Sequence, residues 1–213
     1  MASSKPALPL KLYRAELSGH CHRVHLFLGL LGLHYILIDV DLPGGAHKQP
    51  DFLAKNPFGQ VPVLEDGDVI LYDSNAILVY LASRYDDGNW LPTDPVLSAR
   101  VQQWLSLAAG QIAYGPAAAR LATVFGASLD HDRAKAIANG LLRVLDETLS
   151  RGAFAIGDTP TIADVAAYGY IARAPEGGIS LEPYPAVKSW LRRIEALPGF
   201  IPFKETKVSS ANE

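Results

Sequence analysis

The stretch that decides the fold runs from Asn56 to Leu81 and reads NPFGQVPVLEDGDVILYDSNAILVYL. It contains two short apolar runs, Val61–Leu64 and Val69–Tyr72, with an Asp-Gly pair between them. Two short strands around such a pair predict a tight β-hairpin. Asp73 and Ser74 then offer side chains that can cap a helix, and the apolar residues beyond them recur at helical spacing. The stretch therefore predicts a β-hairpin followed by a helix.

The residues ahead of this stretch complete a small α/β unit. Leu10–Tyr13 and Tyr35–Val40 predict two strands, and the apolar residues between them fall on one face of a helix that ends at Gly32. Such a strand–helix–strand unit forces its strands parallel and its crossover right-handed. A helical turn at Asp51–Lys55 leads to the hairpin, so we expect a small mixed sheet with helices on its faces. Tyr35–Val40 is nearly all apolar, which predicts a strand covered on both faces.

From residue 94 on, every convincing element is helical. Asp94 and Pro95 begin a long helix, because proline is tolerated at the first helical position. On the predicted helix Asp130–Ser150 we expect Val144 and Thr148 to face inward. The predicted helix Thr161–Ala172 is apolar almost all round, which predicts that it is buried. The later predicted helices are Asp130–Ser150, Thr161–Ala172 and Pro185–Leu197. The chain is thus expected to form two domains, residues 1–84 and 95–213, joined by a linker at 85–94.

Composition excludes several classes of protein. The 213 residues are 49% hydrophobic, and 19 Lys+Arg against 22 Asp+Glu give a net charge of −3, which excludes intrinsic disorder and argues against a nucleic-acid partner. The longest strongly apolar stretch, Leu26–Leu33, is far shorter than the roughly 20 residues that span a membrane. The single Cys21 excludes an intrachain disulfide and predicts a reducing cytoplasm. Residues 1–9 lack the apolar core of a signal peptide, so we expect a short loose end.

The turn Glu16–Val24, ELSGHCHRV, joins the first strand to the first helix. A helix N-terminus favours an anion, and Ser18 stands where it can donate its hydroxyl hydrogen to one. On the residues alone, a simple N-cap is the stronger interpretation of Ser18. Arg23 is expected to be a solvated or interdomain charge. The turn and the residue that follows it contain four residues of types that bind zinc: His20, Cys21, His22 and His25. Their spacing argues against a zinc site, because residues so close in sequence cannot all converge on one ion.

Two further motifs allow two interpretations each. Pro62 lacks the N–H that strand pairing needs, so a cis Val61–Pro62 bond could leave the backbone of Val61 to a ligand. The alternative is an edge strand with a trans proline, which frequency favours because only about 5–6% of such bonds are cis. Asp73 and Ser74 either cap a helix or form an anion site, with Ser74 for a carboxylate and Asp73 for an ammonium.

A third motif, Thr161–Asp164, reads TIAD and predicts a capping box, in which Asp164 reaches back to the backbone N–H of Thr161. In a helix buried on all sides these donors have no water to bind. The motif is therefore expected to serve folding, and we assign it no catalytic role.

Taken together, these segments resemble the cytosolic glutathione S-transferase family, and within it the bacterial, serine-type members close to the theta, delta and zeta classes. The resemblance covers about residues 10–200 and rests on the order and spacing of Ser18–Val24, Gly45–His47, Pro50–Asp68, Asp73–Leu81 and Thr161–Asp164. It implies an α/β plus all-α fold, in which an N-terminal thioredoxin-like βαβαββα domain binds glutathione and a C-terminal all-helical domain carries the electrophile pocket.

The resemblance also implies a role for each site residue. Ser18 matches the catalytic serine that donates a hydrogen bond to the glutathione sulfur and favours its thiolate. His47 and Gln60 would approach the glycine carboxylate of glutathione. Val61 would pair its backbone with the cysteinyl residue, ahead of a cis Pro62.

Asp73 and Ser74 would hold the γ-glutamyl end. The family more often has Glu where this chain has Asp73, which shortens the reach to the ammonium. His20 stands where the family often has Pro, Ser or Asn, which leaves open a role beside the sulfur for His20 and for Cys21.

The chemistry that such a site must supply is a lower thiol pKa. A free thiol has a pKa of about 8.5, and one hydroxyl donor with a helix N-terminus can lower it by about one to two. Ser18 is too weak a base to remove the proton, so it acts as a donor to the thiolate. The second substrate is expected between the domains; for Trp104 and Leu107, a place in the helical core is equally open. The expected electrophile pocket comprises Leu17, Trp104, Leu107, Tyr114 and Ala118.

The predicted function is therefore a glutathione transferase that acts on a small apolar electrophile, with glutathione as co-substrate, no metal and a role in detoxification. Alternatives are a glutathione-dependent isomerase, a disulfide reductase, or a non-catalytic module that binds glutathione or a partner. A dithiol redox protein is excluded because Cys21 has no second cysteine. The family implies a homodimer, for which the chain offers apolar positions on the Pro95–Gly115 helix and near Phe58. No membrane association is expected.

Overall fold

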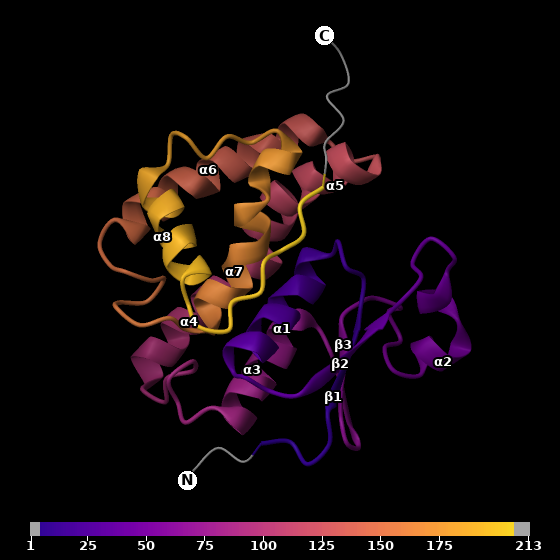
Figure 1. The fold of residues 1–213 in the computed structure, drawn as a ribbon. Helices are drawn as coiled ribbons and strands as arrows, with labels where there is room; N and C mark the ends of the chain where they lie inside the picture. Colours follow the sequence, from indigo (N-terminus) through magenta and orange to yellow (C-terminus); the bar gives the residue numbers. More distant parts are fainter. Residues whose placement is uncertain (1–4, 207–213) are drawn as a thin grey trace. The chain divides into compact units, whose positions relative to one another are not determined.

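The computed structural model describes residues 5–206, and the chain divides into two units (Figure 1). The sheet-bearing unit contains the described residues up to Thr93 and, in addition, Leu197–Phe203. The helical unit contains Asp94–Ala196 and the described residues from Lys204 onward. No pattern in the sequence predicted that Leu197–Phe203 belongs with the sheet. Of the expected loose end, residues 1–4 lie outside the described residues, and residues 5–9 form no helix or strand.

The sheet has four strands in the order β2-β1-β3-β4. β1 (Leu10–Arg14) pairs parallel with β2 (Tyr35–Asp39) and antiparallel with β3 (Val63–Asp66). β3 pairs antiparallel with β4 (Val69–Tyr72), and α1 (Gly19–Leu30) connects the two parallel strands. The predicted mixed sheet is confirmed, and its register brings the first strand and both hairpin strands side by side.

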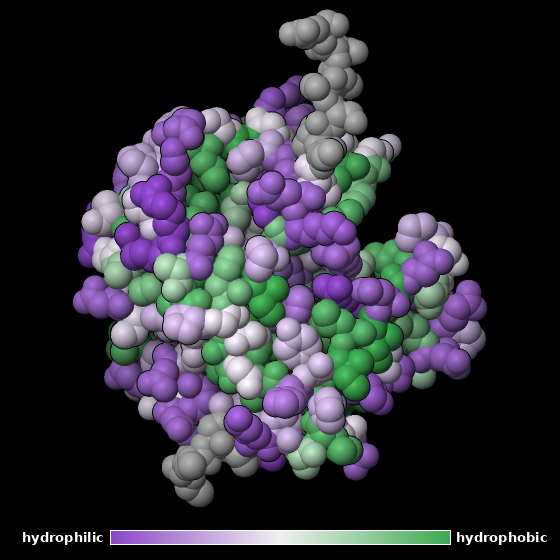
Figure 2. Space-filling view, in the orientation of Figure 1, coloured by the Kyte–Doolittle hydropathy of each residue, from purple (hydrophilic) through white to green (hydrophobic). Residues whose placement is uncertain are grey.

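The expectation that the second strand is covered on both faces is wrong. β2 lies at the edge of the sheet with only β1 beside it, and Ile36 is 50% exposed. The fully buried strand residues are instead on the two central strands, Leu10 and Leu12 on β1 and Val63 and Leu64 on β3. Apolar composition alone does not distinguish an edge strand from a central one. In the space-filling view, hydrophobic residues reach the surface over the region of the strands (Figure 2).

Helices complete the core of this unit. α1 and α3 (Ser74–Tyr85) lie against each other (Figure 1), while α2 (Pro50–Leu53) follows a short 3₁₀ turn at Ala46–Lys48. Their inward apolar side chains are fully buried: Val24, Leu26, Phe27 and Leu28 on α1, and Ile77, Leu78 and Leu81 on α3. Each such side chain contributes about 1.5–3 kcal/mol through burial.

The helical unit contains one α-helix that the sequence did not predict. Its α-helices are α4 (Pro95–Ala109), α5 (Ala118–Phe125), α6 (His131–Leu149), α7 (Ile162–Ala172) and α8 (Pro185–Glu195). α5 is the unpredicted one, and a π-helical segment at Ala113–Ala117 precedes it. Pro116 lies inside that segment and cannot donate a backbone hydrogen bond, which breaks the α pattern. A Cβ on Gly115 would lie 3.0 Å from the backbone nitrogen of Ala138, so the bend also brings the chain close to α6.

Two expectations about burial in this unit have different outcomes. α7 is buried on all sides, as its composition predicted, and only its last residue is less than fully buried. On α6, however, Val144 is 61% exposed and Thr148 is also exposed, so placing both inward is wrong. The buried stripe of α6 is offset from them and consists of Ala134, Ala138, Leu141, Leu142, Leu145 and Leu149. None of the helices in the described part of the chain is long and apolar enough to cross a membrane.

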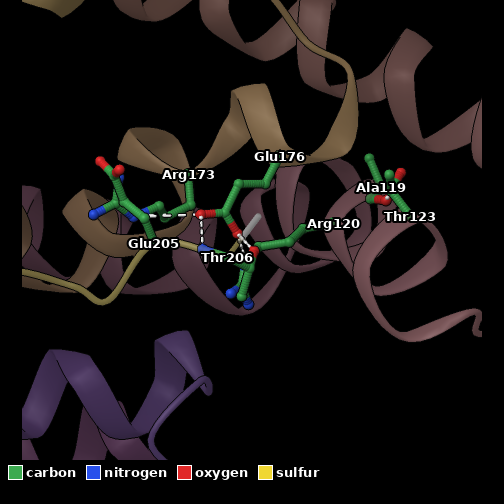
Figure 3. Close-up of polar contacts among 7 residues, drawn as sticks. All are labelled: Ala119, Arg120, Thr123, Arg173, Glu176, Glu205 and Thr206. Atoms are coloured by element: carbon green, nitrogen blue, oxygen red, sulfur yellow. Dashed lines mark hydrogen bonds and ion pairs between the residues drawn. The ribbon is translucent and has the colours of Figure 1, made fainter. Parts of the chain in front are cut away.

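A buried ion pair ties the last described residues to the helical unit (Figure 3). Arg120 on α5 donates to Oε2 of Glu176 at 2.7 Å, and the backbone N–H of Thr206 donates to Oε1 of Glu176 at 3.0 Å. The hydroxyl of Thr206 also donates to this carboxylate, and Arg173 lies 3.7 Å from it. Burial alone would raise the pKa of Glu176, but the hydrogen bonds from Thr206 and Arg120 outweigh it and lower that pKa. The carboxylate is therefore held ionised among its donors.

Candidate active site

The N-terminus of α1 is capped by Ser18, whose Oγ accepts a hydrogen bond from the backbone N–H of Cys21 at 3.3 Å. Ser18 is half-buried, with extended backbone angles of −84° and 121°. A hydroxyl that accepts through its oxygen still has its own hydrogen to donate. The cap and the donor role that the sequence left as alternatives are therefore compatible in one residue.

The two neighbours of Ser18 in the first turn of α1 are both neutral. Burial, and then the charge of Arg23, lower the pKa of His20 to about 4 against the opposing effect of Asp73. Cys21 is buried, and its sulfur accepts from the backbone N–H of Ala15 at 3.4 Å. Burial raises the pKa of the Cys21 thiol to about 11. Neither side chain brings a charge to this helix terminus at neutral pH, and Cys21 is not a nucleophile.

Arg23 is buried, at 2% exposure, so its expected role as a solvated or interdomain charge is wrong. Its Nη1 donates to Oγ of Ser74 at 2.9 Å and to Oδ1 of Asn75 at 2.7 Å. The guanidinium thus links α1 to the N-terminus of α3 within one unit. Sequence reasoning missed both Arg23 and Asn75, because nothing in a single sequence shows that an arginine on one helix reaches acceptors about 50 residues away.

The N-terminus of α3 is capped by Asp73, whose Oδ1 accepts from the backbone N–H groups of Asn75 and Ala76, each at 2.9 Å. Asp73 is exposed and has φ = 67°, which is uncommon for a residue other than glycine and costs about 1–3 kcal/mol. Ser74 behind it is buried. The cap predicted for this position is confirmed, and the strained backbone marks it as a site that the surrounding structure enforces.

The loop before β3 is organised by Asn56, a buried residue that sequence reasoning did not single out. Its Nδ2 donates to the backbone oxygen of Gln60 at 2.8 Å, and its Oδ1 accepts from the backbone N–H of Phe58 at 3.0 Å. The Val61–Pro62 bond is cis, as the family resemblance implies and contrary to the frequency argument. β3 begins only at Val63, so Val61 lies outside the strand ladder.

His47 and Gln60 lie on segments that are tied together. His47 is half-buried in the 3₁₀ turn Ala46–Lys48, and Gln60 is exposed at the end of the loop. Lys48 donates from Nζ to the backbone oxygens of Phe58 and Gly59, each at 3.2 Å. Gly59 has φ = 58°, and a Cβ there would lie 2.7 Å from the backbone oxygen of His47. Glycine is therefore required where the turn and the loop meet.

The sheet register places most of these segments at one end of the sheet. Tyr13 near the end of β1 is opposite Val63 at the start of β3, and Val63 is opposite Tyr72 at the end of β4. The turn that leads to Ser18 follows β1, the Val61–Pro62 bond directly precedes β3, and the Asp73–Ser74 pair directly follows β4, so all three adjoin this row. Two helix N-termini and a piece of backbone outside the strand pairing thus lie at the same end of the sheet, which is a place for an extended ligand with negative ends.

The residues expected to line the electrophile pocket are more dispersed. Trp104 and Leu107 on α4 line a depression of about 660 Å³ between α4 and α6. Tyr114, 68% exposed, lines an adjoining one of about 480 Å³. Trp104 is nevertheless buried, and Ala118 is half-buried at the start of α5. Leu17 belongs to the sheet-bearing unit. Within residues 5–206, no group of three or more His, Cys, Asp or Glu side chains is placed to hold a metal ion.

Comparison with known proteins identifies the family. Two family models match, the N-terminal domain of glutathione S-transferase over residues 17–84 and its C-terminal domain over residues 113–198. The chain is 38% identical to glutathione S-transferase 3 of Zea mays, over 90% of this chain and 91% of that protein. It is 30% identical to glutathione S-transferase theta-2B of Homo sapiens, over 89% of this chain and 82% of that protein.

A solved structure gives the same result. The crystal structure of a glutathione S-transferase from Pseudomonas fluorescens superposes with a TM-score of 0.88 at 34% identity, over 93% of this chain and all of that one. Domain order, sequence and fold agree over nearly the whole length. The chain belongs to the glutathione S-transferase family.

Proposed function

We propose that the protein catalyses the attack of glutathione, as its thiolate, on a small apolar electrophile. The observation that carries the proposal is the position of Ser18: a half-buried hydroxyl with its hydrogen available, at the N-terminus of α1 and at the edge of the sheet where Val61 and Asp73–Ser74 also lie. A hydrogen-bond donor beside a helix N-terminus stabilises an anion at the point where the reaction needs one.

The residues around this edge fit the functional groups of glutathione. The backbone of Val61 is outside the strand ladder and can pair with the cysteinyl residue. The buried guanidinium of Arg23 and the N-terminus of α3 favour a carboxylate at Ser74, the proposed γ-glutamyl end. Asp73 is the acceptor proposed for the ammonium, and His47 and Gln60 the donors proposed for the glycine carboxylate.

The proposed reaction follows from these assignments. The thiol proton passes to solvent, and Ser18 donates its hydroxyl hydrogen to the thiolate that remains. The sulfur lone pair then forms a carbon–sulfur bond, while the electrophile expels its leaving group or takes up a proton. Each drop of one in the thiol pKa corresponds to about 1.4 kcal/mol of preference for the thiolate. Cys21 takes no part because its own thiol is buried.

The variant Ser18→Ala tests this function. We expect kcat with a chromogenic aryl halide to fall roughly 10- to 100-fold, with little change in the affinity for glutathione, because the hydrogen bond matters most for the anion. Ultraviolet titration of the enzyme–glutathione complex should show a higher thiol pKa in the variant. Full activity of Ser18→Ala would remove Ser18 from the mechanism.

Other reactions of the same thiolate are tested alongside. Disulfide and isomerisation substrates run next to the aryl halide distinguish a reductase or an isomerase from a transferase. One observation favours a non-catalytic glutathione-binding module: Oδ1 of Asp73 is already engaged in capping α3. Tight binding of glutathione without turnover of a broad panel of electrophiles would support that module. The apolar character of the second substrate stays a prediction from Leu17, Trp104, Leu107, Tyr114 and Ala118.

We propose further that the protein is a cytoplasmic homodimer with a role in detoxification. The dimer is supported by exposed apolar side chains, Val144 and Tyr114 beside the depressions of the α4–α6 face, and Phe58 stacked edge-to-face on Tyr72. Patches of this kind mark interaction surfaces. Sedimentation of Val144→Glu should show a shift toward monomer, and an unchanged dimer would exclude this face.

A further inference from the structure

The segment Leu197–Phe203, which we call the C-terminal strap, follows α8 but belongs to the sheet-bearing unit. It lies directly on the backbone of α1. A Cβ added to Gly29 would lie 2.6 Å from the backbone oxygen of Gly199 and 2.6 Å from Cδ1 of Ile201. Gly199 itself has φ = 82°, a conformation that other residues adopt only with strain. Glycine on both sides therefore allows the strap to reach the helix.

A second contact joins the strap to α1 at His22. Nε2 of His22 lies 2.8 Å from the backbone oxygen of Ile201. A carbonyl oxygen can only accept, so Nε2 carries the hydrogen and donates it. The imidazole also stacks on Phe203, with ring centroids 4.6 Å apart and an interplanar angle of 16°. Both rings are buried, which makes this a specific contact rather than a surface one.

The two contacts give the strap a direction. His22 and Gly29 are seven residues apart, so they lie two turns apart on the same face of α1. Gly199 meets α1 near its C-terminus, at Gly29, and Phe203 meets it near its N-terminus, at His22. Ile201 lies between them, with its side chain toward Gly29 and its backbone oxygen at His22. The strap thus runs antiparallel to the helix and ends at the first turn. There the backbone N–H of His22 donates to the backbone oxygen of Ser18 at 2.9 Å.

We propose that His22 is a positioning residue for the thiolate site and that the C-terminal strap is part of that site's scaffold. His22 closes the first turn of α1 onto Ser18 with its backbone, and its side chain is held by the strap. Loss of the side-chain hydrogen bond would let this turn move and change where the Ser18 hydroxyl points. Small displacements of a catalytic group can cost large factors in rate. The inference rests on the proposed role of Ser18.

The test uses three substitutions on α1 of the full-length protein. His22→Phe keeps a ring to stack on Phe203 but removes the donor to Ile201. His22→Gln places an amide N–H near the position of Nε2 and should restore the contact. His25→Phe is the matched control, because His25 lies on the same helix but contacts Tyr35 at 3.0 Å instead of the strap.

The readouts are the thiol pKa of bound glutathione, the split between kcat and KM, and hydrogen exchange in the first turn of α1. For His22→Phe we expect the thiol pKa to rise by about one, kcat to fall roughly tenfold, and exchange to quicken, with the KM for the electrophile unchanged. His22→Gln should lie close to the wild type, and His25→Phe should leave the thiol pKa unchanged. A thiol pKa that is the same in folded His22→Phe as in the wild type would overturn the proposal.

A second variant covers the case in which His22→Phe does not fold. Gly29→Ala displaces the strap from α1 without removing the donor on His22, and the inference predicts the same direction of change in thiol pKa. Ser18→Ala distinguishes a failure of the proposed function from a failure of the positioning role of His22 alone. If Ser18→Ala leaves the thiol pKa unaltered, the proposed function fails; if it raises that pKa while His22→Phe and Gly29→Ala do not, only the positioning role fails.

Discussion

The N-termini of α1 and α7 are capped by hydrogen bonds of the same length but lie in different surroundings. Ser18 on α1 accepts from the N–H of Cys21 at 3.3 Å, and Thr161 on α7 accepts from the N–H of Ala163 at 3.3 Å. Thr161 belongs to a complete capping box and is buried, whereas Ser18 is half-buried and the first turn of α1 has no acidic residue. The first turn of α7 thus contains a carboxylate that accepts from its backbone, whereas no acidic side chain offsets the partial positive charge at the N-terminus of α1, where we propose the thiolate.

Asp164 shows how fully the α7 terminus is satisfied. Its two oxygens accept from the backbone N–H groups of Thr161 at 2.8 Å and Ala155 at 2.7 Å, and from the indole N–H of Trp190 at 2.8 Å. A buried carboxylate with so many donors organises the fold. Of the two caps, only Ser18 combines partial exposure with a first turn that has no acidic residue, and it is the one that we propose for function.

The largest expected effect on stability comes from removing the Asp164 carboxylate at the N-terminus of α7. Asp164→Ala leaves the buried donors of Thr161 and Trp190 and the partly buried N–H of Ala155 without their acceptor, so we expect the free energy of unfolding to fall by about 3–5 kcal/mol. Urea denaturation followed by circular dichroism measures it. Ser18→Ala, which removes the other cap, should lose no more than about 1–2 kcal/mol. Equal losses at the two positions would contradict the contrast between them.

The next effect concerns the guanidinium of Arg23, which links α1 to the N-terminus of α3. Arg23→Met keeps the aliphatic bulk of the side chain but removes the cation that donates to Ser74 and Asn75. We expect the KM for glutathione to rise roughly tenfold while kcat at saturation changes less, since binding of the γ-glutamyl carboxylate is weakened in ground state and transition state alike. A fall in kcat alone would show that Arg23 acts on the sulfur instead.

A smaller effect is expected at the cap of α3. Asp73→Asn retains a capping side chain and tolerates the positive φ, but removes the negative charge proposed for the ammonium of glutathione. The KM for glutathione should rise about threefold with little change in thermal stability, because a single exposed charge contributes little. Isothermal titration with glutathione measures the affinity. If binding is unaltered, Asp73 only caps the helix.

The last effect is a change in the pH dependence of stability, which leaves stability at neutral pH nearly unaltered. The pKa of His20 is lowered from 6.5 to about 4, so the unfolded chain binds a proton there that the folded chain does not. Stability is therefore lost as pH falls from about 6.5 to 4. His20→Asn should flatten this part of the stability profile. Some slope should remain, because burial also lowers the pKa of His25 to about 4. An unchanged slope in His20→Asn would mean that His20 is more solvated than the structure shows.

Local signals in the sequence were sufficient for much of this fold. The Asp-Gly hairpin, the caps at Asp73 and Asp94 and the all-apolar α7 follow from short patterns, and each is present in the structure. The family resemblance implied the cis bond before Pro62, which frequency opposed.

What the sequence did not reveal depends on neighbours that are distant along the chain. Burial of Arg23 requires knowing that α3 packs on α1, and the edge position of β2 requires the strand order. Val144 is exposed because the buried residues of α6 lie on a slightly different side of the helix from the one predicted. Apolar periodicity alone does not determine that side. α5 was not predicted, and in the structure the π-helical segment that contains Pro116 separates it from α4.

The shielding of Cys21 has a consequence for a protein proposed to handle reactive molecules. Compounds that alkylate glutathione also alkylate exposed protein cysteines, because both present sulfur nucleophiles. This chain has one cysteine, which is out of solvent and has a thiol pKa of about 11, so almost none of it is ionised near pH 7. We therefore expect electrophiles to alkylate this cysteine only slowly while the protein is folded.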